Sequence, residues 1–347
     1  MAKRTDNTNL ILEFITRHPL LSSKEIYEGL GIKTGYATVK RVIQKLIAEN
    51  LIISEGLGKG TKYKVSGAYE LLYPIELDIY FQKEIDERKI KSNFTHSLIP
   101  LLNTISIFTA KELNHLNSLH EKYTANVTRL SKTVYNKELE RLSIDLSWKS
   151  SQIEGNTYSL LETERLLKEK ETATGKTKDE AIMLLNHKEA LDFIIQNPTY
   201  VTPLTIARIE DIHSILIKEL NIDRNIRRRR VGISGTNYVP LDNEFQIREA
   251  LESMCTFLNN QQNIFTRAFL ALILLSYIQV FEDGNKRTAR IISNAVLISA
   301  KYCPISFRTV DAIEYKKTML IFYEQNNIAP FKKIFIQQVE FAVNTYF

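Results

Sequence analysis

One stretch of the chain, residues 269–292, limits most strongly the folds that this sequence can adopt. It begins with an apolar, helix-like run, FLALILLSYIQVF, which stops at the acidic, glycine-containing turn EDGN, residues 282–285. The chain then continues as a second helical pattern that carries Lys286, Arg287 and Arg290. The sequence therefore predicts two helices joined by a short turn, with the free N-terminus of the second helix at that turn.

The turn has the features of a site that binds nucleotide phosphates. The first turn of a helix has unpaired N–H groups and the positive end of the helix dipole, which together attract anions. Gly284 permits a positive φ and lets a phosphate approach the backbone closely. Arg287 and Arg290 lie three residues apart on one face of the helix, and guanidinium groups suit phosphate oxygens. Asp283, beside that anion, suits a Mg²⁺ ion shared with the phosphates.

The composition is that of an ordinary soluble globular protein. Of the 347 residues, 44% are hydrophobic and 25% are charged. No uncharged apolar run approaches the length of a membrane span, and the N-terminus lacks the apolar core of a secretory signal. Cys255 and Cys303 are too few for a disulfide framework and are expected in the core, and the six histidines form no metal-spaced set. We therefore expect a cytoplasmic protein with no membrane partner.

The first seventy residues predict three helices followed by a β-hairpin. Apolar periodicity and capping residues place the helices within residues 5–18, 22–32 and 34–50. Two β-like runs, LIIS at 51–54 and KYKVS at 62–66, are joined by the glycine-rich stretch EGLGKGT. These seventy residues hold 11 Lys and Arg against 7 Asp and Glu, within a chain of net charge +6, and this asymmetry indicates an anionic partner.

This order of elements resembles the winged helix-turn-helix family, which would occupy residues 1–68 and be followed by a linker over 69–80. In that family the third helix enters the major groove of DNA and the hairpin wing contacts phosphates. By this resemblance, the residues that face DNA would be Tyr36, Lys40, Arg41 and Gln44 on the third helix, with Lys59 and Lys62 on the wing. The alternative role for such a domain is that of a protein–protein adaptor.

Residues 279–290 resemble the signature of the Fic family, H-x-F-x-[D/E]-G-N-[G/K]-R-x-x-R. The matching residues are Phe281, Asp283, Gly284, Asn285, Arg287 and Arg290. Upstream, SSQIEGN at 150–156 looks like the family's inhibitory motif, and the stretch at 229–242 looks like its β-hairpin flap. The arginine run 227–230 would then be a solvated approach to that flap rather than a nucleic-acid patch. The implied fold is mainly α: an all-helical Fic domain over 81–347 with a small β-hairpin flap, after the winged helix-turn-helix.

The resemblance implies an activity and a role for each motif residue. Most Fic proteins transfer AMP from ATP to a Ser, Thr or Tyr hydroxyl of a target protein. Asp283 would hold Mg²⁺ against the phosphates, and Phe281 would be buried to fix the loop. The residues that would bind the nucleotide are Asp283, Gly284, Asn285, Lys286, Arg287 and Arg290, with Arg287 also counted as catalytic.

Two further elements would control the target and the activity. The flap, at Ile233, Ser234 and Gly235, would hold a target segment by strand addition. Glu154 would reach Arg290 and occupy the space of the γ-phosphate, and Ser150, one helical turn earlier, would orient Glu154. The family resemblance also implies a homodimer.

The catalytic histidine of the family is replaced by Gln279. In the family this histidine takes the proton from the attacking hydroxyl, and general-base catalysis of this kind contributes roughly 10²–10⁴ in rate. A carboxamide cannot accept that proton, so we expect nucleotide binding with weakened transfer. Lys286 is also found at this position in the Doc toxins, which transfer the γ-phosphate instead, and this leaves phosphate transfer open.

Three functions are consistent with these features. The first is a Fic-type adenylyltransferase of unknown target protein, auto-inhibited by Glu154 and weakened by Gln279. The second is a nucleotide-responsive, DNA-binding transcription regulator whose Fic domain is catalytically silent. The third is a structural partner that sequesters another Fic protein or its target. The survival of so many motif residues favours the enzyme.

Overall fold

The computed structural model describes residues 7–31 and 34–347, apart from the side chain of Lys59. The chain divides into two compact units. The first runs to Pro74 and includes Pro100–Leu113, and the second consists of Ile75–Ile99 and Asn114–Phe347. The chain therefore passes from the first unit to the second at residue 75 and returns to the first at residue 100. From residue 114 onward it belongs to the second unit.

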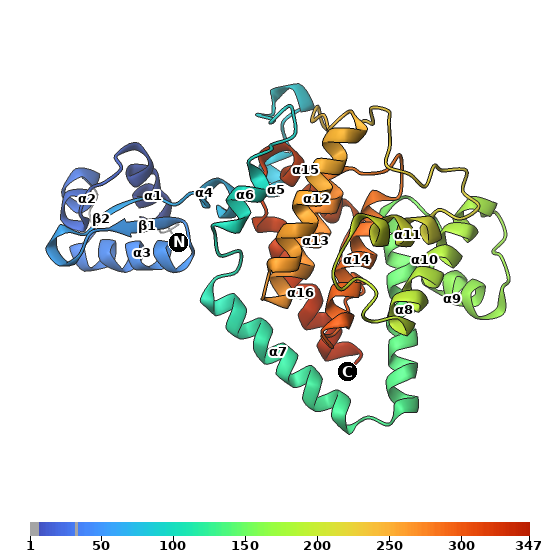
Figure 1. The fold of residues 1–347 in the computed structure, drawn as a ribbon. Coiled ribbons are helices and arrows are strands. Elements are labelled where there is room, and N and C mark those ends of the chain that lie inside the picture. Colours follow the sequence, from blue (N-terminus) through green and yellow to red (C-terminus); the bar gives the residue numbers. More distant parts are fainter. Residues whose placement is uncertain (1–6, 32–33) are drawn as a thin grey trace. The chain divides into compact units, whose positions relative to one another are not determined.

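The described part of the first unit begins with three helices and one antiparallel hairpin (Figure 1). The elements are α1 (Asn7–Arg17), α2 (Ser23–Leu30), α3 (Tyr36–Ala48), β1 (Ile52–Glu55), the 3₁₀ turn η1 (Gly58–Gly60) and β2 (Lys62–Val65). The two strands pair from Ile52 with Val65 to Glu55 with Lys62. Buried aliphatic side chains from all three helices form the core: Ile11, Ile15, Ile26, Val39, Ile43 and Leu46. The helices and the hairpin predicted from the sequence are thus present in the predicted order.

Helix α2 shows how local chemistry sets these boundaries. The Ser22 hydroxyl accepts a hydrogen bond from the backbone N–H of Glu25, whose carboxylate accepts one in return from the N–H of Ser22. This reciprocal capping box satisfies two donors that the helix itself leaves unpaired. At the other end, Gly31 takes a left-handed conformation with φ of 59° and ends the helix.

The second unit is built from helices (Figure 1). Within it lie α5 (Leu77–Tyr80), η2 (Ile85–Glu87), α8 (Lys132–Ile153), α9 (Leu160–Glu169), α10 (Lys178–Gln196), α11 (Ile206–Leu216), α12 (Glu244–Asn260), α13 (Ile264–Ile278), α14 (Asn285–Ser299), α15 (Ala312–Gln325) and α16 (Ala329–Thr345). The remaining helices are α4 (Tyr69–Leu72) in the first unit, and α6 (Leu98–Asn103) and α7 (Ala110–Arg129), which each span a boundary between the units.

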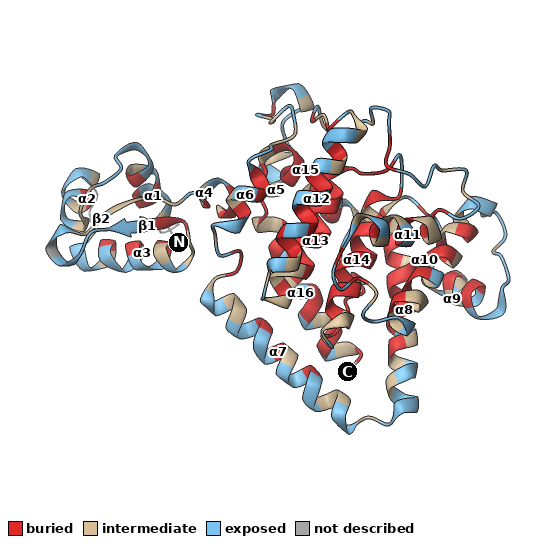
Figure 2. Ribbon diagram, in the orientation of Figure 1, coloured by how far each residue is buried: buried red, intermediate tan, exposed pale blue. Residues whose placement is uncertain are grey.

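Helix α13 forms the centre of the second unit. All of its residues from Ala268 to Ile278 are buried, as its red ribbon in Figure 2 shows. A helix that is apolar on every side is stable in water only when other elements surround it. Here α14 packs along it, with α12 and α15 as further neighbours, while α8, α10 and α11 pack against α14. The predicted pair of helices joined by a short turn is confirmed, and it is the core of the unit.

The β-hairpin predicted at residues 229–242 is wrong. Among the described residues, strand pairing in a sheet is confined to β1 and β2, and this stretch is a loop with a turn at Ser234 and Gly235. Its backbone carbonyls bind arginine side chains instead of a second strand: Arg227 Nη1 donates to the Arg229 carbonyl at 2.8 Å. One isolated parallel bridge joins Val239 to Asn93. We call residues 229–242 the flap loop.

Two expectations from composition can also be compared with the structure. Cys255 and Cys303 are both buried and unpaired, as predicted for core residues. Across residues 7–31 and 34–347, no helix has both the length and the apolarity that crossing a membrane requires.

Candidate active site

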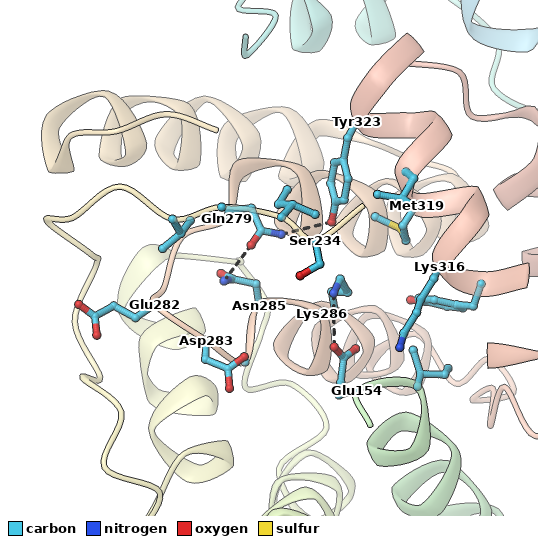
Figure 3. Close-up of a pocket in the computed structure, with 17 residues that line it drawn as sticks. Glu154, Ser234, Gln279, Glu282, Asp283, Asn285, Lys286, Lys316, Met319 and Tyr323 are labelled. Carbon is cyan, nitrogen blue, oxygen red and sulfur yellow. Dashed lines mark hydrogen bonds and ion pairs between the residues drawn. The ribbon is translucent and has the colours of Figure 1, made fainter. Parts of the chain in front are cut away.

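A cavity of about 370 Å³ lies where α13 ends and α14 begins (Figure 3). Four segments of the second unit line it. They are the end of α8 with Glu154, residues 231–234 of the flap loop, the motif loop from Gln279 to Lys286, and α15. The side chains from α15 are those of Tyr315, Lys316, Met319, Leu320 and Tyr323.

The motif loop exposes the N-terminus of α14 to this cavity. Gly284 has φ of 79° and ψ of 0°, a conformation that L side chains rarely adopt. A Cβ atom there would lie 3.3 Å from the ring of His213, a tight contact that adds to the backbone preference for glycine. Because glycine cannot cap the helix with a side chain, the first-turn N–H groups of α14 are available to an anion.

Asn285 closes the motif loop through its carboxamide. Its Oδ1 accepts a hydrogen bond from the Phe281 backbone N–H at 2.8 Å, and its Nδ2 donates to the Phe281 carbonyl at 2.7 Å. Asn285, which was predicted to bind the nucleotide, therefore fixes the motif loop with its side chain. It also lines the cavity beside Gly284. These two hydrogen bonds to the Phe281 backbone hold Gly284 where an anion can approach it.

His213, on α11, supports the loop from beneath and was not predicted as a site residue. Its ring stacks on Phe281 at a centroid distance of 3.6 Å, and its Nε2 lies 3.0 Å from the carbonyl oxygen of Asp283. Burial lowers the pKa of His213 to about 4, so the ring is neutral at pH 7. The predicted burial of Phe281 is confirmed. Nothing in the sequence near position 213 signals this contact, because it joins residues about seventy positions apart.

Gln279, at the position of the family histidine, is held by hydrogen bonds within the protein. Its Nε2 donates to the Ser276 carbonyl at 2.6 Å and lies 3.2 Å from the Tyr323 hydroxyl, and its Oε1 accepts from Asn285 at 3.3 Å. Burial raises the pKa of Tyr323, so that hydroxyl stays protonated at neutral pH. No histidine is among the described residues that line the cavity, so the site has no imidazole base.

The two motif arginines lie under the cavity rather than in its lining. Arg287 is 1% exposed; its guanidinium donates to Asp283 Oδ2 at 3.1 Å and lies 3.5 Å from the Leu216 carbonyl. Arg290 is fully buried and donates to the Ser150 hydroxyl at 2.8 Å and the Ser150 carbonyl at 3.0 Å. Ser150 thus orients Arg290, and its effect on Glu154 is indirect.

Glu154 is the acidic group that faces the motif helix. It caps the C-terminus of α8, and its carboxylate accepts from Arg290 at 2.8 Å and from Lys286 Nζ at 3.4 Å (Figure 3). Burial by itself raises the pKa of Glu154, but the charges of Arg290 and Lys286 outweigh it and lower the pKa to about 2. The carboxylate is therefore ionised throughout the physiological range, and it places a negative charge in the cavity.

Asp283 is the residue that suits a metal ion. Its side chain is 65% exposed, lines the cavity, and uses one oxygen to pair with Arg287. Mg²⁺ commonly binds through one or two protein carboxylates together with substrate phosphates, so a single exposed carboxylate beside an anion site fits it. Across the described residues there is no cluster of three or more acidic, histidine or cysteine ligands.

The flap loop presents an open peptide edge to the cavity. Ile233 and Ser234 line it, whereas Gly235 does not, because the Gly235 carbonyl accepts a hydrogen bond from Arg88 Nη2 at 3.0 Å. Within the described part of the chain, the backbone of residues 231–234 makes no hydrogen bond. These four residues can therefore pair with another chain.

The predicted DNA-facing residues belong to the first unit. The side chains of Tyr36, Lys40, Arg41 and Gln44 on α3 and of Lys62 on β2 are exposed. Lys40 Nζ lies 5.4 Å from the centre of the Tyr36 ring, so two of them form one small surface. The side chain of Lys59 lies outside what the structure describes.

Comparison with known proteins identifies the fold around the cavity. The model of the Fic/DOC family matches residues 203–297. The chain is 26% identical over 243 residues to a protein adenylyltransferase Fic of Culex quinquefasciatus, covering 68% of this chain and 46% of that protein. It is 28% identical over 208 residues to one of Nematostella vectensis, covering 57% and 47%. The chain thus spans about half the length of the curated relatives it matches.

Solved structures agree on the fold. Fic-1 of C. elegans (residues 134–508 of that protein) superposes with a TM-score of 0.59 at 21% identity, over 68% of this chain and 72% of that one. A Fic family protein from Desulfovibrio desulfuricans gives a TM-score of 0.58 at 16% identity, over 70% and 74%. The resemblance seen in the motif is confirmed: residues 203–297, from α11 into α14, match the Fic/DOC family model.

Proposed function

We propose that this chain is a Fic-type protein adenylyltransferase, inhibited by its own Glu154 and slowed by Gln279. The observation that carries the proposal is the cavity in which three features meet: the free N-terminus of α14, the exposed carboxylate of Asp283, and the ion pair of Glu154 with Arg290. Relatives that bear the name adenylyltransferase support this activity.

ATP is the proposed substrate, with its phosphates at the first turn of α14. The backbone N–H groups after Gly284 donate to phosphate oxygens, and Lys286 supplies a cation at the cavity wall. Arg287 does not line the cavity. It attracts the phosphates through its positive charge, and its hydrogen bond holds the Asp283 carboxylate in place. Asp283 would hold Mg²⁺, which would neutralise charge on the phosphates.

The proposed transfer leaves one proton without an acceptor. The oxygen of the target hydroxyl forms a bond to the α-phosphorus of ATP, and the bond from that phosphorus to the bridging oxygen breaks. Pyrophosphate leaves with the electron pair, and the hydroxyl proton has to pass to a base. Gln279 cannot take it, and solvent is a poor substitute at neutral pH, so the rate falls by roughly 10²–10⁴ relative to a site with an imidazole.

Glu154 opposes productive binding of ATP. Its carboxylate holds Arg290 and Lys286, the two cations that the γ-phosphate would otherwise meet. A phosphate placed there would face a negative charge at short range in a partly desolvated site. Removal of Glu154 therefore frees both the space and the cations.

The test is self-modification with ATP labelled on the α-phosphate, run in parallel with ATP labelled on the γ-phosphate. Four proteins are compared: the unaltered chain, Glu154→Gly, Gln279→His and the double variant, with Asp283→Asn in the double variant as the inactive control. We expect the strongest α-label in the double variant and weak α-label with Glu154→Gly. Transfer of the γ-label instead would show a phosphotransferase, and absence of label from every protein would contradict self-modification by this site.

The second candidate function is nucleotide-responsive transcription regulation through the first unit. Two observations favour it. The polar and basic face of α3 is exposed, and the side chain of Gln279 is held by hydrogen bonds within the protein. A winged helix-turn-helix over residues 1–68 would place Lys40 and Arg41 on DNA. Binding to a randomised duplex library should then fall for Lys40→Ala and Arg41→Ala, and not for Lys24→Ala on α2, which pairs with Glu28. Equal binding by all three variants would count against this function.

A further inference from the structure

Three consecutive arginines of the flap region are exposed beside the cavity. Arg228, Arg229 and Arg230 directly precede residues 231–234, which line it. Within the described part of the chain, only Arg228 of these three forms an ion pair, with Glu244 at 2.9 Å. Arg229 and Arg230 thus form no ion pair among the described residues next to the open edge of the flap loop, and Arg230 lines a second hollow together with Asp242.

The fourth arginine of the run has a different role. Arg227 is 2% exposed and donates to the carbonyls of Gln279 at 2.6 Å, Arg229 at 2.8 Å and Leu241. It ties the start of the flap loop to the motif loop and to the flap's own far end. The arginines that follow it consequently project from a fixed backbone rather than from a free tail.

The other end of the open edge is also fixed. Arg88 donates to the Gly235 carbonyl at 3.0 Å, and the backbone N–H of Val239 donates to the Ser92 carbonyl at 2.8 Å. Residues 231–234 are thus anchored on both sides while their own backbone groups stay unpaired. A preorganised edge of this kind costs little conformational entropy when a partner strand pairs with it.

We propose that the segment taken by this edge is an extended polypeptide with acidic residues flanking its hydroxyl residue, a substrate class that rests on the proposed function. A strand advances about 3.3 Å per residue, so a peptide paired with 231–234 passes Arg230 and Arg229 one and two residues beyond the segment that lines the cavity. Carboxylates at those positions form charge-assisted hydrogen bonds with the two guanidinium groups. The positive charge also speeds the encounter with an acidic target.

The charge of the cavity explains why the acids flank the hydroxyl rather than adjoin it. Glu154 and Asp283 are paired with arginines, but Glu282 lines the cavity and is exposed, without an ion pair among the described residues. A carboxylate directly beside the hydroxyl would face Glu282. Nucleic acid would satisfy the arginines equally well, yet it has no peptide groups to pair with the open edge, so the geometry favours a polypeptide.

The experiment measures peptide binding to the Glu154→Gly protein saturated with a non-hydrolysable Mg-ATP analogue. Three fluorescent ten-residue peptides share a central Tyr and carry Glu, Gln or Lys at the flanking positions. We expect the Glu peptide to bind at least about tenfold tighter than the Gln peptide, a difference of about 1.4 kcal/mol, and the Lys peptide to bind weakest. The preference should shrink at high salt.

The double variant Arg229→Gln, Arg230→Gln should bind the Glu peptide as weakly as the Gln peptide. Its affinity for the Gln peptide should equal that of the protein that retains both arginines. Its matched control is Arg165→Gln with Lys168→Gln, which removes the same charge from the exposed face of α9 and should have no effect. Thermal unfolding of both variants checks that the fold is retained.

The proposal is overturned if the three peptides bind equally or not at all, or if the double variant keeps the preference. It is also overturned if a DNA duplex or an anionic vesicle binds these arginines more tightly than the Glu peptide. Binding of the ATP analogue, titrated before the peptides are added, tests the proposed function separately. A protein that binds the nucleotide but shows no charge preference would retain that function and lose only this inference.

Discussion

At the residue scale, Lys286 lies between two anions. It contacts Glu154 at 3.4 Å, and it stands in the first turn of α14 where the proposed phosphates bind. A lysine paired with Glu154 is less available to a phosphate, so the loss of Lys286 should weaken ATP binding less when Glu154 is present. The side chain is only partly exposed, which makes its charge effective at short range.

The prediction is that Lys286→Met weakens Mg-ATP binding more in the Glu154→Gly background than beside an intact Glu154. In the first case the change removes a phosphate ligand; in the second Lys286 is already paired with Glu154, so its loss removes less of the attraction for phosphate. We expect the two effects to differ about fivefold, a coupling near 1 kcal/mol, in calorimetric dissociation constants for the four proteins of the cycle.

The control is Lys316→Met, because Lys316 lines the same cavity but forms no ion pair among the described residues. Its effect on ATP binding should be equal in the two backgrounds. If Lys286→Met also weakens ATP binding equally in the two backgrounds, the contact between Lys286 and Glu154 contributes nothing to the free energy of ATP binding.

At the scale of elements, the segment from α5 to Ser92 joins the flap loop to α15. Arg88 is the central residue: its guanidinium donates to Glu324 at 3.0 Å and to the Gly235 carbonyl at 3.0 Å, and both charged side chains are almost fully buried. Tyr80 also donates to Glu324, at 2.6 Å. Two walls of the cavity are therefore held by one buried ion pair.

The prediction is that Arg88→Met destabilises the second unit by about 3 kcal/mol, since it leaves the Glu324 carboxylate buried without its cation. Amide hydrogen exchange in residues 235–239 should become faster, because that part of the flap loop loses an anchor. Arg228→Met is the matched control: its ion pair with Glu244 is exposed, and such pairs contribute about 0–1 kcal/mol. Similar losses in both variants would show that Arg88 does not anchor the loop.

The elements differ in how far the sequence predicts them. The α13–turn–α14 unit was predicted because its signals are local: an unbroken apolar run, a glycine at a positive φ, and a renewed helical period. The flap loop was predicted as a hairpin because residues 229–242 resemble the flap of the Fic family. Whether such a stretch pairs depends on its neighbours, and here arginine side chains take its carbonyls.

The supporting contacts of the site could not be predicted for a related reason. His213 reaches the motif loop across seventy positions, and Arg88 reaches Glu324 across 236. Stacking and buried ion pairs of this kind have no period or spacing in the sequence. The residues proposed to bind an anion are thus readable from the motif, whereas those that hold them in place appear only with the fold.

At the scale of the whole molecule, the Glu154 contacts link the proposed inhibitory element to the stability of the fold. The carboxylate joins the end of α8 to α14, and its pKa is about 2 in the folded protein against an ordinary value of 4.5. A pKa lowered by folding means that the unfolded state binds the proton more readily. The stabilisation is therefore fully present well above pH 4.5 and is lost as the pH falls toward 2.

The prediction is that the free energy of unfolding of the unaltered chain exceeds that of Glu154→Gln by about 3 kcal/mol at pH 7, and that this difference falls by about 2 kcal/mol by pH 3. Trp148, the single tryptophan, lies on α8 in the second unit, so its fluorescence in urea follows the unit that contains Glu154 even if the two units unfold separately. Glu164→Gln, whose ion pair with Lys168 is exposed, should show little difference at either pH. A difference for Glu154→Gln that does not change with pH would mean that the carboxylate is not held charged by Arg290 and Lys286. In that case Glu154 could not be the charged group that excludes the γ-phosphate at neutral pH, and its inhibition would have to rest on size alone.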